Sequence, residues 1–433
     1  MRFEQLIPAF FSPRDAAERV TSDDVDAEYR DEFGLLAPIP ASHGQRRAPA
    51  EGFFSGPEIG ERLPDFELPS ADGKTIDFHT NRAGKKAAVV FYRSAVWCPL
   101  CMTQLVELQQ SRPKFEEAGI ELYAISYDEV DALADFALHH GITYPLLSDV
   151  GSKVIDRFGI RNHFVTRDQV PYYGIPFPGT YLVDEEGKVA NKFFHRNLAQ
   201  RESAESIIDA ALGRIVLGDD EPHAEAGEDD ISITAAYHGG DGTMKAGVMR
   251  QVVVRFDLAP GVHIYGEPVP SGMVAAKITV RGPEGLHAGE TIAPPTHAHA
   301  QPGLDMELPV WEGQVDFLVP VHVDYRIASI VDEIQRETIP LEVEVEYQAC
   351  DEQRCRIPRR ETISLSVPVA PHVGNSLAGE LAGTVTTTMD SRRFMLRMLL
   401  RGWRQSPLRG AWYLLKLLFE IRRGPTGRRR RSS

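Results

Sequence analysis

Cysteine is scarce in this chain of 433 residues, which contains only four. Small secreted domains that are held together by disulfides are cysteine-dense, so the scarcity excludes a disulfide-stapled scaffold. The four cysteines form two close pairs, Cys98 with Cys101 and Cys350 with Cys355. Two isolated pairs of this kind are typical of local redox sites.

Long hydrophobic runs are also missing. No run reaches the roughly 18 apolar residues that a membrane-spanning helix requires. Residues 1–20 contain no continuous apolar segment of signal-peptide length, and charged residues follow quickly from Arg14. We therefore expect a protein that stays on the cytoplasmic side, where thiols are normally reduced and a cysteine pair is catalytic or transient.

An excess of positive charge is lacking as well, because the net charge is -15. This charge argues against nucleic acid as a partner of the whole chain. No nucleotide or flavin motif is visible, so we expect no bound cofactor, and reducing equivalents must come from a small thiol or another protein, such as a thioredoxin-like one. Residues 391–433 depart from the rest, with thirteen Arg or Lys and one acid.

Composition and periodicity divide the chain into six segments. Strands alternating with helices predict an α/β domain, and many short strands between Pro and Gly turns predict an all-β sandwich. A run with seven acids and no Lys or Arg predicts a solvated linker. The segments are an N-terminal extension (1–58), the α/β domain (59–215), the acidic linker (216–230), the sandwich (231–369), a second linker (370–390) and the basic tail (391–433).

The first cysteine pair stands in Trp97-Cys98-Pro99-Leu100-Cys101, between the predicted strand 87–92 and a predicted helix over 99–117. A helix N-terminus favours the reactive thiolate. We expect Cys98, the more exposed of the two, to attack a substrate disulfide and Cys101 to resolve the mixed disulfide. Half of a zinc site is the alternative for this spacing.

Three segments of the α/β domain resemble the thioredoxin superfamily, in its redoxin branch of AhpC/TSA peroxiredoxins and thioredoxin-like reductases. These are LPDFELPSADGKTIDF, VVFYRSAVWCPLC and PGTYLVDEEGKV. The resemblance implies a thioredoxin-like fold, with Pro178 as a cis-proline that faces the cysteines. An ordinary trans proline is the alternative.

The chain departs from the peroxiredoxin pattern at two positions before Cys98. Phe91 stands where those proteins resemble one another in a proline, and Ala95 stands where they carry Thr or Ser, so a hydroxyl that would orient a peroxide is missing. Arg93 or Ser94 could take over that polar role, since arginine stabilises anionic oxygen. The alternative is that both are surface loop residues.

The second pair lies in Tyr347-Gln348-Ala349-Cys350 and Cys355-Arg356-Ile357-Pro358, between two strand patterns. Cysteines at a hairpin end can approach within the roughly 7 Å that a disulfide allows between Cα atoms, and a short polar loop predicts an exposed, exchangeable bond. Residues 230–368 resemble the N-terminal immunoglobulin-like domain of the thiol reductase DsbD, which normally works outside the cytoplasm. The resemblance implies that this pair relays electrons from a thioredoxin-fold partner. A purely stabilising disulfide is the alternative.

Two further features concern binding. His297 and His299 have a spacing that suits a metal, but two ligands are insufficient, and we predict no metal site.

The tail contains two helix-like stretches, 392–404 and 408–422, which combine arginines with Leu and Trp. Such helices are typical of interfacial membrane binders, so we expect 391–433 to bind an anionic membrane surface at the inner face. Docking onto an acidic protein, including the chain's own acidic body, is the alternative.

Together these features predict a thiol–disulfide oxidoreductase with protein or small-molecule disulfides as substrates. A thiol peroxidase is the second hypothesis, in which hydroperoxide oxidises Cys98 to a sulfenic acid and Cys101 closes a disulfide. A non-enzymatic, membrane-tethered binding module is the third, and a reactive thiol at Cys98 argues against it.

Overall fold

The computed structural model divides the chain into two compact units, one formed by Met1–Leu212 with Pro371–Ser433 and the other by Gly213–Ala370. Most of the N-terminal extension, residues 1–53, and most of the second linker lie outside the described residues. The structure describes residues 54–167, 169–198, 200–300, 306–323, 327, 337–351, 354–370, 373–374, 385–386, 392–405, 407–408, 411–412 and 415.

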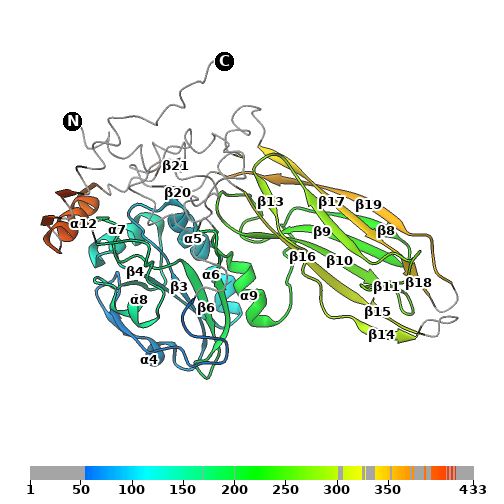
Figure 1. The fold of residues 1–433 in the computed structure, drawn as a ribbon, viewed down its shortest axis with the longest axis horizontal. Helices are drawn as coiled ribbons and strands as arrows, with labels where there is room; N and C mark the ends of the chain where they lie inside the picture. The colour runs from blue at the N-terminus through cyan, green and yellow to red at the C-terminus, as the bar shows by residue number, and fades with distance from the viewer. Residues whose placement is uncertain are drawn as a thin grey trace, which may run out of the picture. The chain divides into compact units, whose positions relative to one another are not determined.

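A five-stranded sheet in the order β5-β4-β3-β6-β7 forms the centre of the first unit (Figure 1). β3 pairs in parallel with β4, β4 in parallel with β5, and β6 antiparallel with β3 and β7. This is the α/β arrangement that the sequence predicts. The strands are β3 (Lys86–Phe91), β4 (Ile120–Ser126), β5 (Leu146–Ser148), β6 (Gly179–Val183) and β7 (Val189–Phe194), with a separate hairpin of β1 (Glu67–Pro69) and β2 (Thr75–Asp77).

The helix predicted over 99–117 is broken in the structure into α5 (Pro99–Gln110) and α6 (Arg112–Glu117). Pro113 cannot donate the hydrogen bond that a continuous helix needs, so it is accommodated in the first turn of α6. Further helices belong to this unit. They are α4 (Phe78–Arg82), α7 (Val130–His140), α8 (Lys153–Arg157) and α9 (Ala204–Leu212).

The tail contributes α12 (Arg392–Gln405) to the first unit, as predicted for its first stretch. Its Phe394, Met395 and Met398 are buried. Arg393 pairs with Asp135 at 3.2 Å. Within the described part of the chain, no helix is both long and apolar enough to cross a bilayer. Most of the second predicted tail helix lies outside the described residues. Two short strands, β20 (Val373–Gly374) and β21 (Val385–Thr386), are described in their backbone only.

The second unit is built of antiparallel strands in three sheets, as the sandwich prediction requires (Figure 1). One sheet has the order β13-β16-β10-β9-β8, another β12-β17-β19 and a third β14-β15-β11-β18. The strands are β8 (His223–Glu228), β9 (Ile231–His238), β10 (Arg250–Leu258), β11 (His263–Tyr265), β12 (Lys277–Arg281), β13 (Leu286–Ala288), β14 (His297–Ala300), β15 (Glu307–Glu312), β16 (Gln314–Val323), β17 (Thr338–Tyr347), β18 (Ala349–Cys350) and β19 (Arg359–Pro368).

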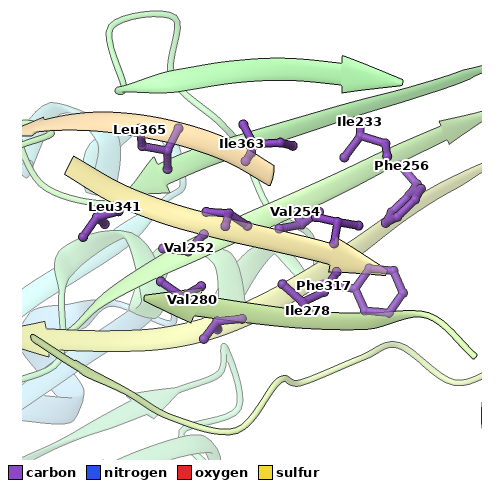
Figure 2. Packing of buried hydrophobic residues seen from close by; sticks show 14 of the residues in the cluster. Ile233, Val252, Val254, Phe256, Ile278, Val280, Phe317, Leu341, Ile363 and Leu365 are labelled. Carbon is purple, nitrogen blue, oxygen red and sulfur yellow. The ribbon is translucent and has the colours of Figure 1, made fainter. Parts of the chain in front are cut away.

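Aliphatic and aromatic side chains from these sheets fill one core, part of which is drawn in Figure 2. Every second residue of β16 is buried, which is the two-residue period of a strand with one face inward. Phe256 packs edge-on against Phe317 at 5.6 Å and against Tyr347 at 5.4 Å between ring centroids. The core fixes β17, and with it the hairpin that carries the second cysteine pair.

The predicted acidic linker is wrong over residues 223–228, which form β8 and pair with β9. The segment alternates in exposure, and Ala224 and Ala226 pack against the core while the charged residues between them face solvent. Composition concealed this alternation, because small alanines supply the inward face of an edge strand.

Candidate active site

Cys98 lies at the N-cap of α5, directly after the loop that leaves β3, and Cys101 lies in the first turn. Pro99 starts the helix at a position where no backbone N–H is needed. Both cysteines are free thiols. We expected Cys98 to be the more exposed, but both cysteines are buried, Cys98 at 1% and Cys101 at 0% exposure, so the two hardly differ.

Trp97, which directly precedes Cys98, is buried and held by two tyrosines. The Trp97 indole Nε1 donates to the hydroxyl of Tyr127 at 2.9 Å, and that hydroxyl donates to the carbonyl of Pro171 at 3.2 Å. Tyr172 packs edge-on against Trp97, with ring centroids 4.9 Å apart. The segment around Pro171 is therefore tied to the tryptophan that precedes Cys98.

Two buried guanidinium groups lie at the sulfurs. Arg93 approaches the Cys98 Sγ at 3.3 Å, and Arg201 approaches the Cys101 Sγ at 3.4 Å and the Cys98 Sγ at 3.9 Å. Arg201 is held by donating to the carbonyls of Leu198 and Gln200 at 2.7 and 2.8 Å. Sequence analysis missed Arg201, because no local motif links it to a cysteine 100 positions earlier. Cationic groups at both sulfurs also oppose a Zn²⁺ ion, which disfavours the zinc alternative.

The two thiols share their protons unequally. Burial raises the pKa of Cys98, and its hydrogen bond with Cys101 adds to that rise. Burial also acts on Cys101, but there the hydrogen bond from Cys98 and the charges of Arg201 and Arg93 outweigh it, so the pKa of Cys101 lies below its ordinary value. The two guanidinium groups therefore favour a thiolate on this pair, and Cys101 is the more acidic of the two thiols.

Asp128 organises the loop between β3 and α5, a role that sequence analysis did not predict. Its carboxylate accepts from the Ser94 hydroxyl at 2.8 Å, the Ala95 N–H at 2.7 Å and the Ser126 hydroxyl at 3.0 Å. Burial raises the pKa of Asp128 to about 6. The alternative that Arg93 and Ser94 are surface residues is wrong, because both are buried. Arg93 contacts the thiol, whereas Ser94 holds the loop.

Pro178 differs from its prediction. The cis X–Pro bonds among the described residues are Val170–Pro171 and Glu267–Pro268, so the Phe177–Pro178 bond is trans. Pro178 directly precedes β6, the strand that begins at Gly179. Phe177, the residue before the proline, is restricted to extended conformations, which suits the entry into a strand. The Phe177 N–H donates to the carbonyl of Ile160 at 2.7 Å, which fixes this entry.

The second cysteine pair is joined as a disulfide across a hairpin end, with Cα atoms 4.1 Å apart. The expected exposure holds for one sulfur only, because Cys355 is exposed and Cys350 is buried. The Tyr265 hydroxyl donates to the Cys350 Sγ at 2.9 Å. Burial raises the pKa of Tyr265, which keeps this hydroxyl protonated as a donor. An attacking thiolate therefore meets the Cys355 sulfur first.

Arg356 anchors the loop that carries Cys355. Its guanidinium donates to both carboxylate oxygens of Asp230, with one contact at 2.8 Å. Its backbone N–H donates to the carbonyl of Ala349 at 2.9 Å, and its carbonyl accepts from the Gln348 side chain at 2.9 Å. These bonds hold the exposed half of the disulfide against the sandwich.

Comparison with known proteins gives a match for each unit. Residues 59–192 match the AhpC/TSA family, and residues 243–367 match the N-terminal part of the thiol:disulfide interchange protein DsbD. A thiol-disulfide oxidoreductase ResA of Bacillus thuringiensis is 29% identical over 146 residues, which are 33% of this chain and 75% of that protein. A putative peroxiredoxin of Mycobacterium tuberculosis is 33% identical over 134 residues, 30% of this chain and 80% of its own.

Solved structures similar to the chain include the peroxidoxin BcpB from Mycobacterium tuberculosis. It has 22% sequence identity and a TM-score of 0.31, and the match covers 36% of this chain and 97% of that one. Peroxiredoxin Q from Xanthomonas campestris matches with 21% identity and a TM-score of 0.29, over 36% of this chain and 97% of its own.

Proposed function

This chain belongs to the AhpC/TSA family through residues 59–192, and on that premise we propose that it is a thiol–disulfide oxidoreductase whose working dithiol is Cys98 and Cys101. That the chain is an oxidoreductase follows from its two matches and its curated relatives. The finer proposal is supported by one observation above all: two free thiols share the first turn of α5 between two buried guanidinium groups.

The exchange proceeds in two substitutions at sulfur. A proton passes from Cys98 to Cys101, and the Cys98 thiolate at the helix N-terminus attacks a substrate disulfide. The substrate S–S bond breaks, a mixed disulfide forms, and the substrate thiolate that leaves takes the proton from Cys101, which becomes a thiolate. Cys101 then attacks the Cys98 sulfur, which releases the second substrate thiolate and leaves a Cys98–Cys101 disulfide. Two electrons pass from the dithiol to the substrate, and Arg93 and Arg201 stabilise the negative charge on sulfur throughout.

The Cys350–Cys355 disulfide is proposed as the relay that accepts these electrons. Attack at the exposed Cys355 sulfur would expel Cys350 as a thiolate, and the Tyr265 hydroxyl stands 2.9 Å from that leaving sulfur. Joining both pairs in one chain raises the effective concentration of each for the other toward the millimolar range. The reduced Cys350/Cys355 pair then passes the electrons to a protein or small-molecule disulfide.

A double substitution tests the relay. In Cys350→Ser, Cys355→Ser, the Cys98/Cys101 dithiol should still react with small disulfides at the parent rate, whereas turnover of the physiological protein substrate should fall to the level of Cys98→Ser. Unchanged turnover of every protein substrate would remove the relay and leave the disulfide a stabilising role.

Peroxidase activity is the second candidate, and the guanidinium of Arg93 at 3.3 Å from the Cys98 sulfur favours it. In that reaction the Cys98 thiolate attacks a peroxide oxygen and the O–O bond breaks. The hydroxide that leaves takes up a proton and becomes water. The resulting sulfenic acid condenses with the Cys101 thiol, which releases a second water and forms the disulfide that a thiol reductant must reopen. Ala95 weighs against this candidate, since its N–H binds Asp128 and it brings no hydroxyl.

The rate at which hydrogen peroxide oxidises the fully reduced protein separates the two candidates, with Cys98→Ser as the blank. Disulfide exchange predicts a rate no better than that of a free thiol. A rate far above it that is lost in Cys98→Ser would assign the peroxidase instead.

The basic tail, residues 391–433, concerns where in the cell the protein works. We propose that residues 391–433 hold the protein at an anionic membrane surface on the cytoplasmic side. The outward face of α12 supports this, because Leu396, Leu400 and Trp403 are 51%, 40% and 47% exposed. Deleting 391–433 should abolish binding to vesicles that contain anionic lipid, and undiminished binding would remove the idea.

A further inference from the structure

Histidine side chains and a carboxylate gather on one face of the sheet β14-β15-β11-β18. His263 pairs with Glu312 across β11 and β15, and Tyr265 and His297 both pair with Val310. Because alternate residues of a strand share a face, His263, His297, His299 and Glu312 all project from the same side of this sheet. These four residues come from three neighbouring strands that the hydrogen-bond ladders hold in register.

Three of these side chains, His263, His299 and Glu312, converge, and His297 lies beside Glu312. The Glu312 Oε1 lies 3.5 Å from the His297 Nε2 and 3.5 Å from the His299 Nδ1. The rings of His263 and His299 are 4.4 Å apart between centroids. Potential ligand atoms of His263, His299 and Glu312 all lie within 4.8 Å of one another.

We propose that His263, His299 and Glu312 bind a divalent transition-metal ion, with a solvent molecule as the fourth ligand. Imidazole nitrogen and carboxylate oxygen are ligands that Zn²⁺ and similar ions prefer, and three of them with one solvent molecule complete a tetrahedral shell. Ligand atoms about 2.1 Å from one ion lie no more than roughly 4.2 Å apart, so the cluster needs only a slight closure to hold it.

Burial and exposure suit this role. His263 is 2% exposed, which places one imidazole ligand on the rigid floor of the site. Glu312 and His297 remain 44% and 52% exposed in their side chains, so an ion has an open path from solvent. The 3.5 Å contacts of the carboxylate are longer than a direct hydrogen bond of about 2.9 Å, which leaves its oxygens placed for a metal.

Titration of the full chain with zinc chloride tests the site. The Cys98→Ser, Cys101→Ser background removes the competing dithiol, and the Cys350–Cys355 disulfide is kept oxidised. We expect one Zn²⁺ per chain by isothermal titration calorimetry, and cobalt chloride should give the visible absorption of a four-coordinate nitrogen and oxygen site. His299→Ala and Glu312→Gln should each weaken binding by at least about tenfold, since even partners outside the metal's own ligands contribute that much.

His287→Ala is the matched control, because His287 stacks on His322 at 4.8 Å elsewhere in the same unit. It should bind Zn²⁺ like the parent. Glu312→Gln preserves the shape of its side chain and His299 is partly exposed, so circular dichroism should show both variants folded. Parent affinity in both variants, or an equal loss in His287→Ala, would overturn the proposal. The readout is metal binding and not thiol chemistry, so the outcome is independent of the proposed redox function.

Discussion

At the scale of single residues, Arg201 controls the charge on the thiol pair. Replacing it by glutamine removes the guanidinium that lies 3.4 Å from Cys101 and 3.9 Å from Cys98. We predict that the pKa of the more acidic thiol rises, because a nearby positive charge that stabilises its thiolate is lost, so that its alkylation sets in at a higher pH. The pH dependence of alkylation by iodoacetamide measures this shift.

Arg112→Gln provides the control, since Arg112 forms an exposed i,i+4 pair with Glu116 and contacts no cysteine sulfur in the described structure. It should alkylate with the parent profile. A parent profile in Arg201→Gln as well would show that burial alone sets the reactivity of the pair.

Asp128 makes the stability of the first unit depend on pH. Its folded pKa of about 6 lies above the ordinary 3.8, so its favourable contribution is complete below about pH 4 and is lost as the pH rises through 6. Two units correspond to about 3 kcal/mol. We therefore expect wild type to lose about this much relative to Asp128→Asn between pH 4 and pH 7.

Urea unfolding at a series of pH values tests this, with hydrogen exchange of the backbone amides of β3 and β4 as the readout. These two strands pair in the central sheet of the first unit, so their exchange reports the unfolding of this unit. A stability difference between Asp128→Asn and wild type that stays constant across the range would contradict the assigned protonation.

The sequence predicts the residues of the dithiol and misses their partners for a physical reason. Cys98 and Cys101 are recognisable because strand, loop and helix N-terminus follow one another locally. Arg201 and Asp128 reach the same loop through tertiary packing, which no spacing reveals. Pro178 was placed correctly before a strand, but its isomer depends on how the chain enters the sheet.

At the scale of elements, the hairpin that carries Cys355 depends on Arg356. Arg356→Ala removes its bonds to the carboxylate of Asp230. Hydrogen bonds to charged groups contribute about 1.5–3 kcal/mol when buried, and less at this partly exposed site. We predict that dithiothreitol reduces the Cys350–Cys355 disulfide several-fold faster, because the loop opens more often.

Arg354→Ala is a close control, since Arg354 is 78% exposed in its side chain and lies 3.9 Å from Asp351. The Arg354→Ala disulfide should be reduced at the parent rate. Equal rates in all three proteins would mean that Arg356 does not restrain the loop.

Strands and helices are predictable from the sequence where apolar residues recur with one clear period, and they are missed where that period is weak. The alternation in β16 and β17 predicts both strands, because each buries every second residue. The composition of β8 predicts a linker, since its inward residues Ala224 and Ala226 are small and give no apolar alternation that stands out from the acidic residues around them. The spacing of apolar residues over 99–117 predicts one helix, but Pro113 divides this segment into α5 and α6.

At the scale of the whole molecule, α12 is docked on its own unit by charge as well as by apolar contact. Arg397 pairs with Asp131 and Glu129, and Arg401 with Glu129 at 3.4 Å. Sequence analysis favoured a membrane for this helix and kept docking onto the chain's own acidic body as the alternative. The structure confirms the alternative for one face of α12, and the outward face stays assigned to a membrane as a proposal.

Reversing Arg393, Arg397 and Arg401 to glutamate should release this helix. Each exposed pair contributes about 0–1 kcal/mol and each reversal adds repulsion, so we predict a total cost of about 1–3 kcal/mol. Hydrogen exchange of residues 392–405 should become faster by one to two orders of magnitude, roughly as that cost implies. Arg404→Glu is the control, because it changes the same charge on the same helix at an exposed position. Unchanged exchange in the triple variant would show that apolar contact alone holds α12.

Transfer of electrons between the two cysteine pairs is the central claim, and covalent trapping in the full chain tests it most directly. In Cys101→Ser, Cys98 can attack but the mixed disulfide cannot be resolved. At a protein concentration too dilute for reaction between chains, peptide mapping by mass spectrometry should find a Cys98–Cys355 disulfide within one chain, with Cys350 left as a free thiol. An intact Cys350–Cys355 disulfide beside a reduced Cys98 that still reacts with small disulfides would contradict the relay.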